Sequence, residues 1–65
     1  MCVVESGIWR IRMYAEGGYS FDVAEDDCHG IRHWYMAGDG WTADADVPRH
    51  VARRLLRKAR RMAGL

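Results

Sequence analysis

The chain has 65 residues, a formal net charge of +1 and two cysteines, Cys2 and Cys28. A chain of this length forms one domain (residues 1–65) that buries only about 60% of its unfolded surface, which excludes a multidomain enzyme. It has no apolar run long enough to span a bilayer and no export signal, so we expect a cytoplasmic protein with free thiols that behave as small hydrophobes.

Two segments in the first third alternate between apolar and polar residues, as half-buried β-strands do. They are residues 8–14 and 19–23. Residues 15–18 between them predict a turn, because their glycines adopt positive φ without strain. We therefore expect an antiparallel hairpin, and another strand could begin at residues 3–4, although residues 5–7 interrupt its pattern. The inward-facing set is Trp9, Ile11, Met13, Tyr19, Phe21 and Val23.

The middle of the chain predicts a polar connection followed by more strand. Residues 24–30 are acidic and polar, whereas residues 31–37 have the Trp, Tyr and Ile content of a strand. Alternation there is ambiguous, and we expect Trp34 and Met36 to face the core. Gly38-Asp39 can form a two-residue turn into a short strand at residues 40–43. The tyrosines expected to be most exposed are Tyr14 and Tyr35.

Residues 46–64 predict one amphipathic helix. Asp46 suits the N-cap, Pro48 the first turn and Gly64 the C-terminal stop. At about 100° per residue, the apolar side chains gather on one arc and the bases on the opposite arc. Together the elements predict an α+β domain, in which an antiparallel meander of three to four strands carries one C-terminal amphipathic helix on one face. The apolar arc consists of Val51, Ala52, Leu55, Leu56, Ala59, Met62 and Ala63.

The near-neutral net charge hides two segments of opposite charge. Residues 1–46 contain nine acids and three arginines, whereas residues 47–65 contain seven bases and no acid. Like charges spaced i,i+4 destabilise a helix by about 0.2–0.5 kcal/mol per pair, and a face that serves only solubility mixes both signs. We therefore expect the bases to bind an anionic partner, with water or the domain's own acids as the alternative. The candidate binding residues are Arg49, Arg53, Arg54, Arg57, Lys58, Arg60 and Arg61.

A second candidate surface is acidic and centres on Glu25-Asp26-Asp27. Such a surface can occupy a cationic groove on another protein as duplex phosphate would, and the alternative is a solvated loop. Asp39 could extend it. The candidate binding residues are Glu16, Asp22, Glu25, Asp26 and Asp27.

Metal binding and catalysis find little support in the sequence. Cys28, His29 and His33 have the elements of a metal site but not the paired spacing of one, and Asp44-Ala45-Asp46 lacks the glycine and glutamate of a calcium loop. No P-loop or G-x-S-x-G motif is present, and adjacent Cys28 and His29 would point in opposite directions in an extended chain. We therefore expect no metal, no cofactor and no enzymatic activity.

Two functions remain. In size, α+β plan and charge segregation the chain resembles the small phage-encoded inhibitors, anti-CRISPR proteins among them. The resemblance carries over no site residue, and it implies a stoichiometric inhibitor that blocks nucleic-acid recruitment or cleavage by a larger protein or nucleoprotein complex in the host cytoplasm. The alternative is a regulatory module that lays its Arg-rich helix on nucleic acid. The sequence pI of about 7.9 is below the value of about 9 typical of such modules, so we expect that binding to be weak. Either could act as a monomer or a small homo-oligomer.

Overall fold

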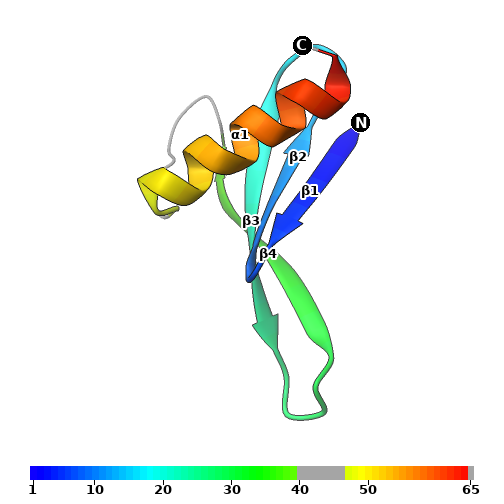
Figure 1. The fold of residues 1–65 in the computed structure, drawn as a ribbon. Coiled ribbons are helices and arrows are strands. Elements are labelled where there is room, and N and C mark those ends of the chain that lie inside the picture. Colours follow the sequence, from blue (N-terminus) through cyan, green and yellow to red (C-terminus); the bar gives the residue numbers. More distant parts are fainter. Residues whose placement is uncertain (40–46, 65) are drawn as a thin grey trace.

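The computed structural model describes residues 1–39 and 47–64. The strands form one antiparallel sheet in the order β1-β2-β3-β4, and the helix α1 packs on one face of it (Figure 1). The predicted α+β meander with one C-terminal helix is confirmed. The element bounds are β1 Cys2–Ser6, β2 Trp9–Met13, β3 Tyr19–Asp26, β4 Arg32–Asp39 and α1 Arg49–Ala63.

The loops after β2 and after β3 share one construction. In the first, Tyr14 N–H donates to the Gly18 carbonyl at 2.8 Å and Gly17 N–H donates back to Tyr14 at 3.0 Å. The second repeats this pattern between Asp27 and Ile31, with Gly30 in the place of Gly17. Both glycines have positive φ, 93° and 78°, as the third residue of a three-residue hairpin loop requires.

Three sequence predictions about the strands are wrong. β1 forms across residues 5–6, where the pattern predicted an interruption. β3 continues to Asp26, so the predicted connection at 24–30 shrinks to residues 27–31. Gly38 and Asp39 end β4 instead of forming a turn. The strand predicted at residues 40–43 and the N-cap predicted at Asp46 lie outside the described residues.

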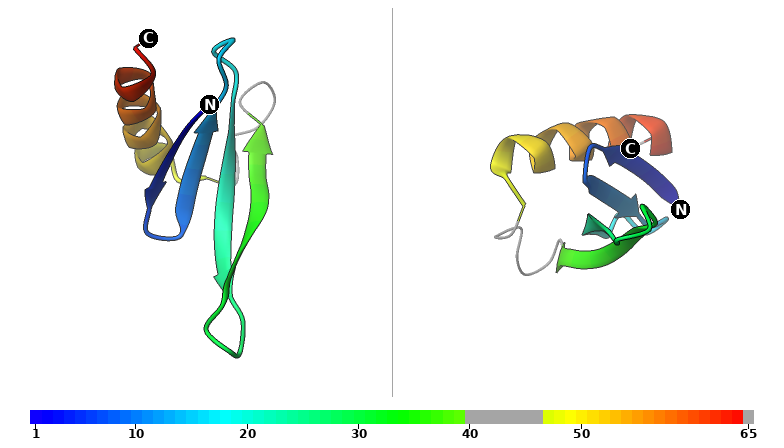
Figure 2. Two further views of the ribbon diagram at one scale, coloured as in Figure 1. Left: turned by 90° about the vertical axis from the view of Figure 1, so that its right-hand side faces the viewer. Right: turned by 90° about the horizontal axis from the view of Figure 1, so that it is seen from below.

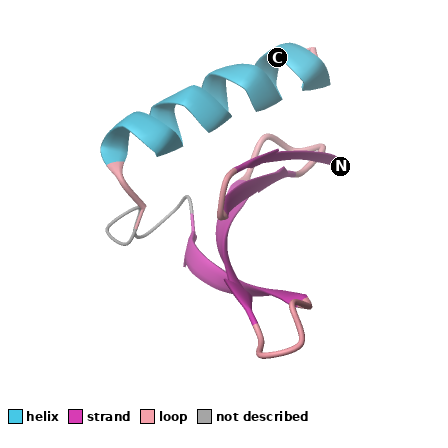
Figure 3. Ribbon diagram, turned by 60° about the horizontal axis from the view of Figure 1, so that its bottom comes forward, coloured by secondary structure: helices cyan, strands magenta, loops and turns pink. Residues whose placement is uncertain are grey.

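The core lies between α1 and the apolar face of the sheet, with α1 placed over β1 and β2 (Figure 2). Ile11, Phe21, Leu55 and Ala59 are almost completely buried there. β3 and β4 extend beyond the part of the sheet that α1 covers (Figure 3), and the molecule is elongated, 38 × 22 × 19 Å. The remaining core residues are Val4, Met13, Ala37, Val47 and Ala52.

The predicted orientation of Trp34 and Met36 is wrong. Trp34 pairs with Ala24 and Met36 with Asp22, so both side chains lie on the face of the sheet opposite α1. An extra residue in β4, Ala37, shifts the register and is buried in the core. Met36 is 68% exposed, and Tyr35, on the α1 side of the sheet, is 52% exposed as predicted. Tyr14 is half-buried.

The ends of α1 match the sequence-based predictions only in part. Pro48 occupies the N-cap position, not the first turn, and its carbonyl accepts N–H groups from Val51 and Ala52 at 3.0 Å. Gly64 ends the helix in the left-handed conformation, as predicted. Met62, predicted to face the core, is 61% exposed near the end of the helix.

Candidate interaction surfaces

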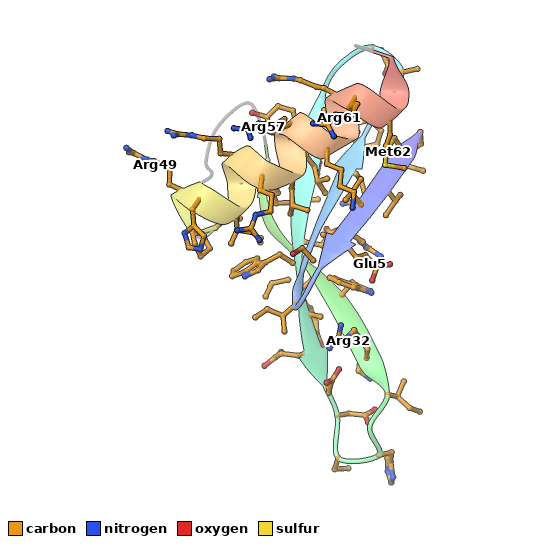
Figure 4. The ribbon with its side chains drawn as sticks, in the orientation of Figure 1. Glu5, Arg32, Arg49, Arg57, Arg61 and Met62 are labelled. Carbon is orange, nitrogen blue, oxygen red and sulfur yellow. The ribbon has the colours of Figure 1, made fainter. Side chains whose placement is uncertain are left out.

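The seven bases of α1 form one exposed surface, which we call the cationic face. Every one of them is exposed, and Arg49, Arg57 and Arg61 are spread along the outside of the helix (Figure 4). They extend from Arg49 in the first turn to Arg61 in the last turn. The surface is therefore about 18 Å long at 1.5 Å per residue. The cationic face comprises Arg49, Arg53, Arg54, Arg57, Lys58, Arg60 and Arg61.

Among the described side chains, those of residues 1–37 and 47–64, no acid forms an ion pair with the cationic face. The first turn of α1 contains no acidic residue, and Arg49 stands at that end, where the helix dipole is positive. Only Arg60 and Arg61, in the last turn, are placed favourably with respect to the dipole. The arrangement therefore costs the helix stability, and neighbouring described groups do not offset this cost.

An apolar side chain lies within the cationic face. Leu56 is half-buried at the border between the core arc and the basic arc. It lines two adjoining surface depressions, of about 460 and 270 Å³, which also share Arg53. The site thus combines guanidinium groups with a small apolar floor. The other lining residues are Arg57, Arg60 and Arg61 in the larger depression and Arg49 and Ala52 in the smaller one.

The predicted acidic surface is divided by the fold. Glu16 is exposed in the loop before β3, whereas Glu25 and Asp26 end that strand. Residues 19–24 of β3 lie between the two sites, which is roughly 20 Å of strand. Glu16 therefore does not join the other acids in one surface, and the side chain of Asp39 lies outside the described set.

Asp22 faces away from α1 as predicted, but it is buried, with 2% of the residue exposed. Its Oδ2 accepts hydrogen bonds from Arg10 Nε and Arg12 Nε, both at 2.8 Å, and its Oδ1 accepts one from Arg12 Nη2 at 3.1 Å. The Arg10 guanidinium also lies 4.4 Å from the ring centroid of Trp34. Sequence reasoning missed this network. Its signal was the pair of arginines two residues apart on the strand that pairs with Asp22.

Asp26 and Asp27 are held by side chains of β4. Arg32 Nε donates to Asp26 at 3.0 Å, which lowers the pKa of Asp26 and raises that of Arg32. Asp27 Oδ2 accepts a hydrogen bond from His33 Nε2 at 2.9 Å, and its Oδ1 accepts the N–H groups of residues 29 and 31. The His33 bond and then the backbone bonds lower the pKa of Asp27. Asp27 therefore organises the β3–β4 loop, and Glu25 is the exposed acid at this end that has no ion-pair partner among the described residues.

The cysteine and histidine side chains of this loop are not gathered into one site. Cys28 is exposed in the loop, so its predicted behaviour as a small hydrophobe is wrong, whereas Cys2 is half-buried beside the core. Both thiols are free. Within the described ranges, no three His, Cys, Asp or Glu side chains are arranged to hold a metal ion.

Comparisons with protein-family models, with curated proteins and with solved structures found no match to this chain. In the part of the chain that the structure describes, no helix is long and apolar enough to cross a membrane. Evidence on function therefore comes from the two surfaces described above. One is a cationic face with no ion-pair partner among the described side chains, and the other is a set of acids that is largely paired within the sheet.

Proposed function

We propose that this chain is a small, non-enzymatic interaction domain whose cationic face binds an anionic surface of a larger protein or nucleoprotein. The observation that carries this proposal is the row of seven exposed bases with no ion-pair partner among the described side chains of residues 1–37 and 47–64. Surface ion pairs contribute only about 0–1 kcal/mol, so stability gives little reason for the pattern, whereas recognition of an anionic partner does. A domain of this kind acts by occupying a site, as a stoichiometric inhibitor of the anti-CRISPR type would.

The structure favours the cationic face over the acidic surface as the contact region. Asp22, Asp26 and Asp27 already accept hydrogen bonds from side chains of the sheet, and Glu16 lies at the other end of β3. A partner would have to break these contacts to engage the carboxylates. The bases of α1 have no such ion pair to break within residues 1–37 and 47–64.

Leu56 favours a protein surface over bare nucleic acid. Phosphate groups present charge but no apolar surface, so phosphate contacts alone leave Leu56 uncovered. A protein segment that presents carboxylates around one apolar side chain matches both the guanidinium groups and Leu56. Burial of Leu56 by such a partner would add apolar contact to charge pairing.

Nucleic-acid binding is the second candidate function, and the composition of the cationic face favours it. Six of its seven bases are arginine, whose planar guanidinium pairs with phosphate in a bidentate manner. In this case affinity would fall steeply with salt, because each phosphate contact releases counterions.

Binding measurements with defined probes separate the two functions. Fluorescence anisotropy of a duplex DNA and of an acidic peptide containing leucine would be compared for the parent, for Arg53→Glu with Arg57→Glu, and for Leu56→Gln. We expect the double reversal to weaken peptide binding at least about tenfold, or 1.4 kcal/mol, while thermal unfolding stays close to the parent. Leu56→Gln should weaken the peptide more than the DNA.

Glu25→Lys is the matched control, because it reverses an exposed charge on the sheet and should leave binding unchanged. A double reversal that folds and binds both probes at parental affinity would contradict the proposal. Tight binding of DNA at physiological salt, insensitive to Leu56→Gln, would instead favour the nucleic-acid function.

A further inference from the structure

The outer edge of β4 has no strand beside it among the described residues. β4 is the last strand in the sheet order, and it is eight residues long. An edge strand presents unpaired N–H and C=O groups, which are a template for pairing with another chain.

The hydrogen bonds on β3 identify the groups that face outward. Asp27 N–H donates to the Ile31 carbonyl at 2.9 Å, so this pair is hydrogen-bonded. Hydrogen-bonded and non-hydrogen-bonded pairs alternate along an antiparallel ladder. The main-chain groups of His33 and Tyr35 therefore face β3, whereas those of residues 32, 34 and 36 face outward. The N–H of Ala24 donates to the carbonyl of Ile8, which precedes β2. The main-chain groups of Ala24 therefore face β2 and not its partner Trp34, which agrees with this alternation.

The side chains along this edge give little protection against pairing. Natural edge strands carry charges, proline or bulges that block another strand. In β4 the bulge at Ala37 comes only after the segment 32–36, and the charge of Arg32 is matched by Asp26. Tyr35 and Met36 are more than half exposed on opposite faces. β1, the other edge, has only five residues, includes Glu5 and lies beside α1.

We propose that β4 pairs antiparallel with β4 of a second copy of this chain, about a two-fold axis at Trp34. In this register Trp34 faces its own counterpart, residue 32 faces residue 36 of the second copy, and residue 33 faces residue 35. All six outward groups of each segment then pair at once, which is the complementarity that an isologous interface needs. Both copies of α1 lie on the same side of the joined sheet.

The charges and side chains of the segment suit this register. Arg32 meets the apolar Met36 of the second copy, and its charge is already paired with Asp26. The two Arg32 residues are about 14 Å apart along the strands, so no like charges are directly opposed. Tyr35 meets His33 on the other face, and aromatic cross-strand pairs of this kind stabilise sheets.

The contact area sets the strength of the dimer. One pair of edge strands buries less than the roughly 1,200 Å² of a standard stable interface, so the dimer should be weak and reversible. Because the two-fold contact uses both β4 edges, it closes at two copies. It also makes no use of the cationic face, so it stands or falls independently of the proposed function.

Two measurements on the full chain, in reducing buffer so that Cys28 cannot form a disulfide, test the proposal. Sedimentation equilibrium should show monomer and dimer in a concentration-dependent balance. In amide hydrogen exchange by NMR, the N–H groups of residues 32, 34 and 36 should become more protected as concentration rises. Those of Val3 and Glu5, which face outward on β1 by the same alternation, should not.

Met36→Lys places a cation opposite Arg32 of the second copy, and the two-fold axis repeats this repulsion. It should weaken dimerisation at least about tenfold. Met62→Lys is the matched control, because it makes the same change at a similarly exposed methionine on α1. It should leave dimerisation unchanged. Met36→Pro removes an outward N–H without removing a bond to β3 and should also abolish the dimer.

A monomer at millimolar concentration would overturn the proposal. So would a dimer that is indifferent to Met36→Lys, one in which the amides of residues 32, 34 and 36 exchange at the same rate at all concentrations, or one that assembles into larger species.

Discussion

The arginines of the sheet and those of α1 differ in how their charge is met. Arg10 and Arg12 share the buried carboxylate of Asp22, and Arg32 pairs with Asp26. The seven bases of the cationic face have no such partner among the side chains described in residues 1–37 and 47–64. Strand pairing brings residues that are far apart in sequence to opposite positions, whereas positions i and i+4 on α1 offer further bases or apolar residues and no acid. The same residue type is thus part of the fold in one region and available to a partner in the other.

The largest effect should come from detaching the cationic face from the sheet. Leu55 is 1% exposed and belongs to the core between α1 and the strands. Leu55→Ala should lower the free energy of unfolding by about 2–5 kcal/mol, because it removes buried apolar contact and leaves a cavity. Chemical denaturation monitored by circular dichroism measures this change. Met62→Ala, at an exposed position of the same helix, should change stability little, and equal effects of the two would mean that α1 is docked differently.

Breaking the charge network of the sheet should have the next largest effect. Asp22→Asn keeps the size of the side chain but removes the charge that Arg10 and Arg12 share. We expect a loss of about 1–3 kcal/mol in the free energy of unfolding, since hydrogen bonds to charged groups contribute about that much. Both arginines are partly exposed and can turn to water, which limits the loss. Glu25→Gln, at an exposed acid of the same strand, should stay within about 0.5 kcal/mol.

On α1, one charge reversal should raise the free energy of unfolding instead of lowering it. Arg49→Glu replaces a base at the positive end of the helix dipole with an acid, which should raise the free energy of unfolding by about 0.3–1 kcal/mol. The same change should weaken binding of an anionic partner. Arg61→Glu, in the last turn, should weaken binding but lower stability. Thermal unfolding at low salt measures both, and a loss of stability with Arg49→Glu would show that the base has a structural role.

The smallest effect should appear in acid. The folded-state pKa values of Asp26 and Asp27 are lower than the ordinary 3.8, so their contribution to stability is complete above that value and is lost as pH falls below it. We expect the amide resonances of His29 and Ile31, whose N–H groups bond to Asp27, to shift in that pH range while the core stays folded. Asp27→Asn should remove the transition. Amide resonances of His29 and Ile31 that stay unchanged well below pH 3.8 would contradict this account.

Local sequence signals were sufficient to predict the helix and the central hairpin. The 3.6-residue period and Gly64 predicted the helix and its end, and residues 8–14 and 19–23 predicted the central hairpin with the correct faces. The sheet with one helix followed from these elements. Gly7, with a φ of 59°, allows the tight turn that completes β1, and that turn is also what made residues 5–7 resemble an interruption.

What the sequence did not predict depends on pairing between distant residues. The faces of Trp34 and Met36 are set by the register of β4 on β3 and by the extra residue at Ala37, which no local pattern reveals. The length of β3 depends on Arg32 and His33, which give Asp26 and Asp27 their partners. The candidate cationic surface could be predicted because a helix face is a local property, whereas the division of the acidic set could not.

The docking of α1 on β1 has a kinetic consequence. Val4 and Leu55 belong to one core although some fifty residues separate them in the chain, so their packing closes a loop that spans most of the chain. The two three-residue hairpin loops close far shorter ones, and loop-closure entropy favours them first. We infer that the strands associate early and that α1 adds its contacts late on the folding path. Contacts formed late govern the unfolding rate, so the lifetime of the folded molecule depends chiefly on how firmly α1 is held.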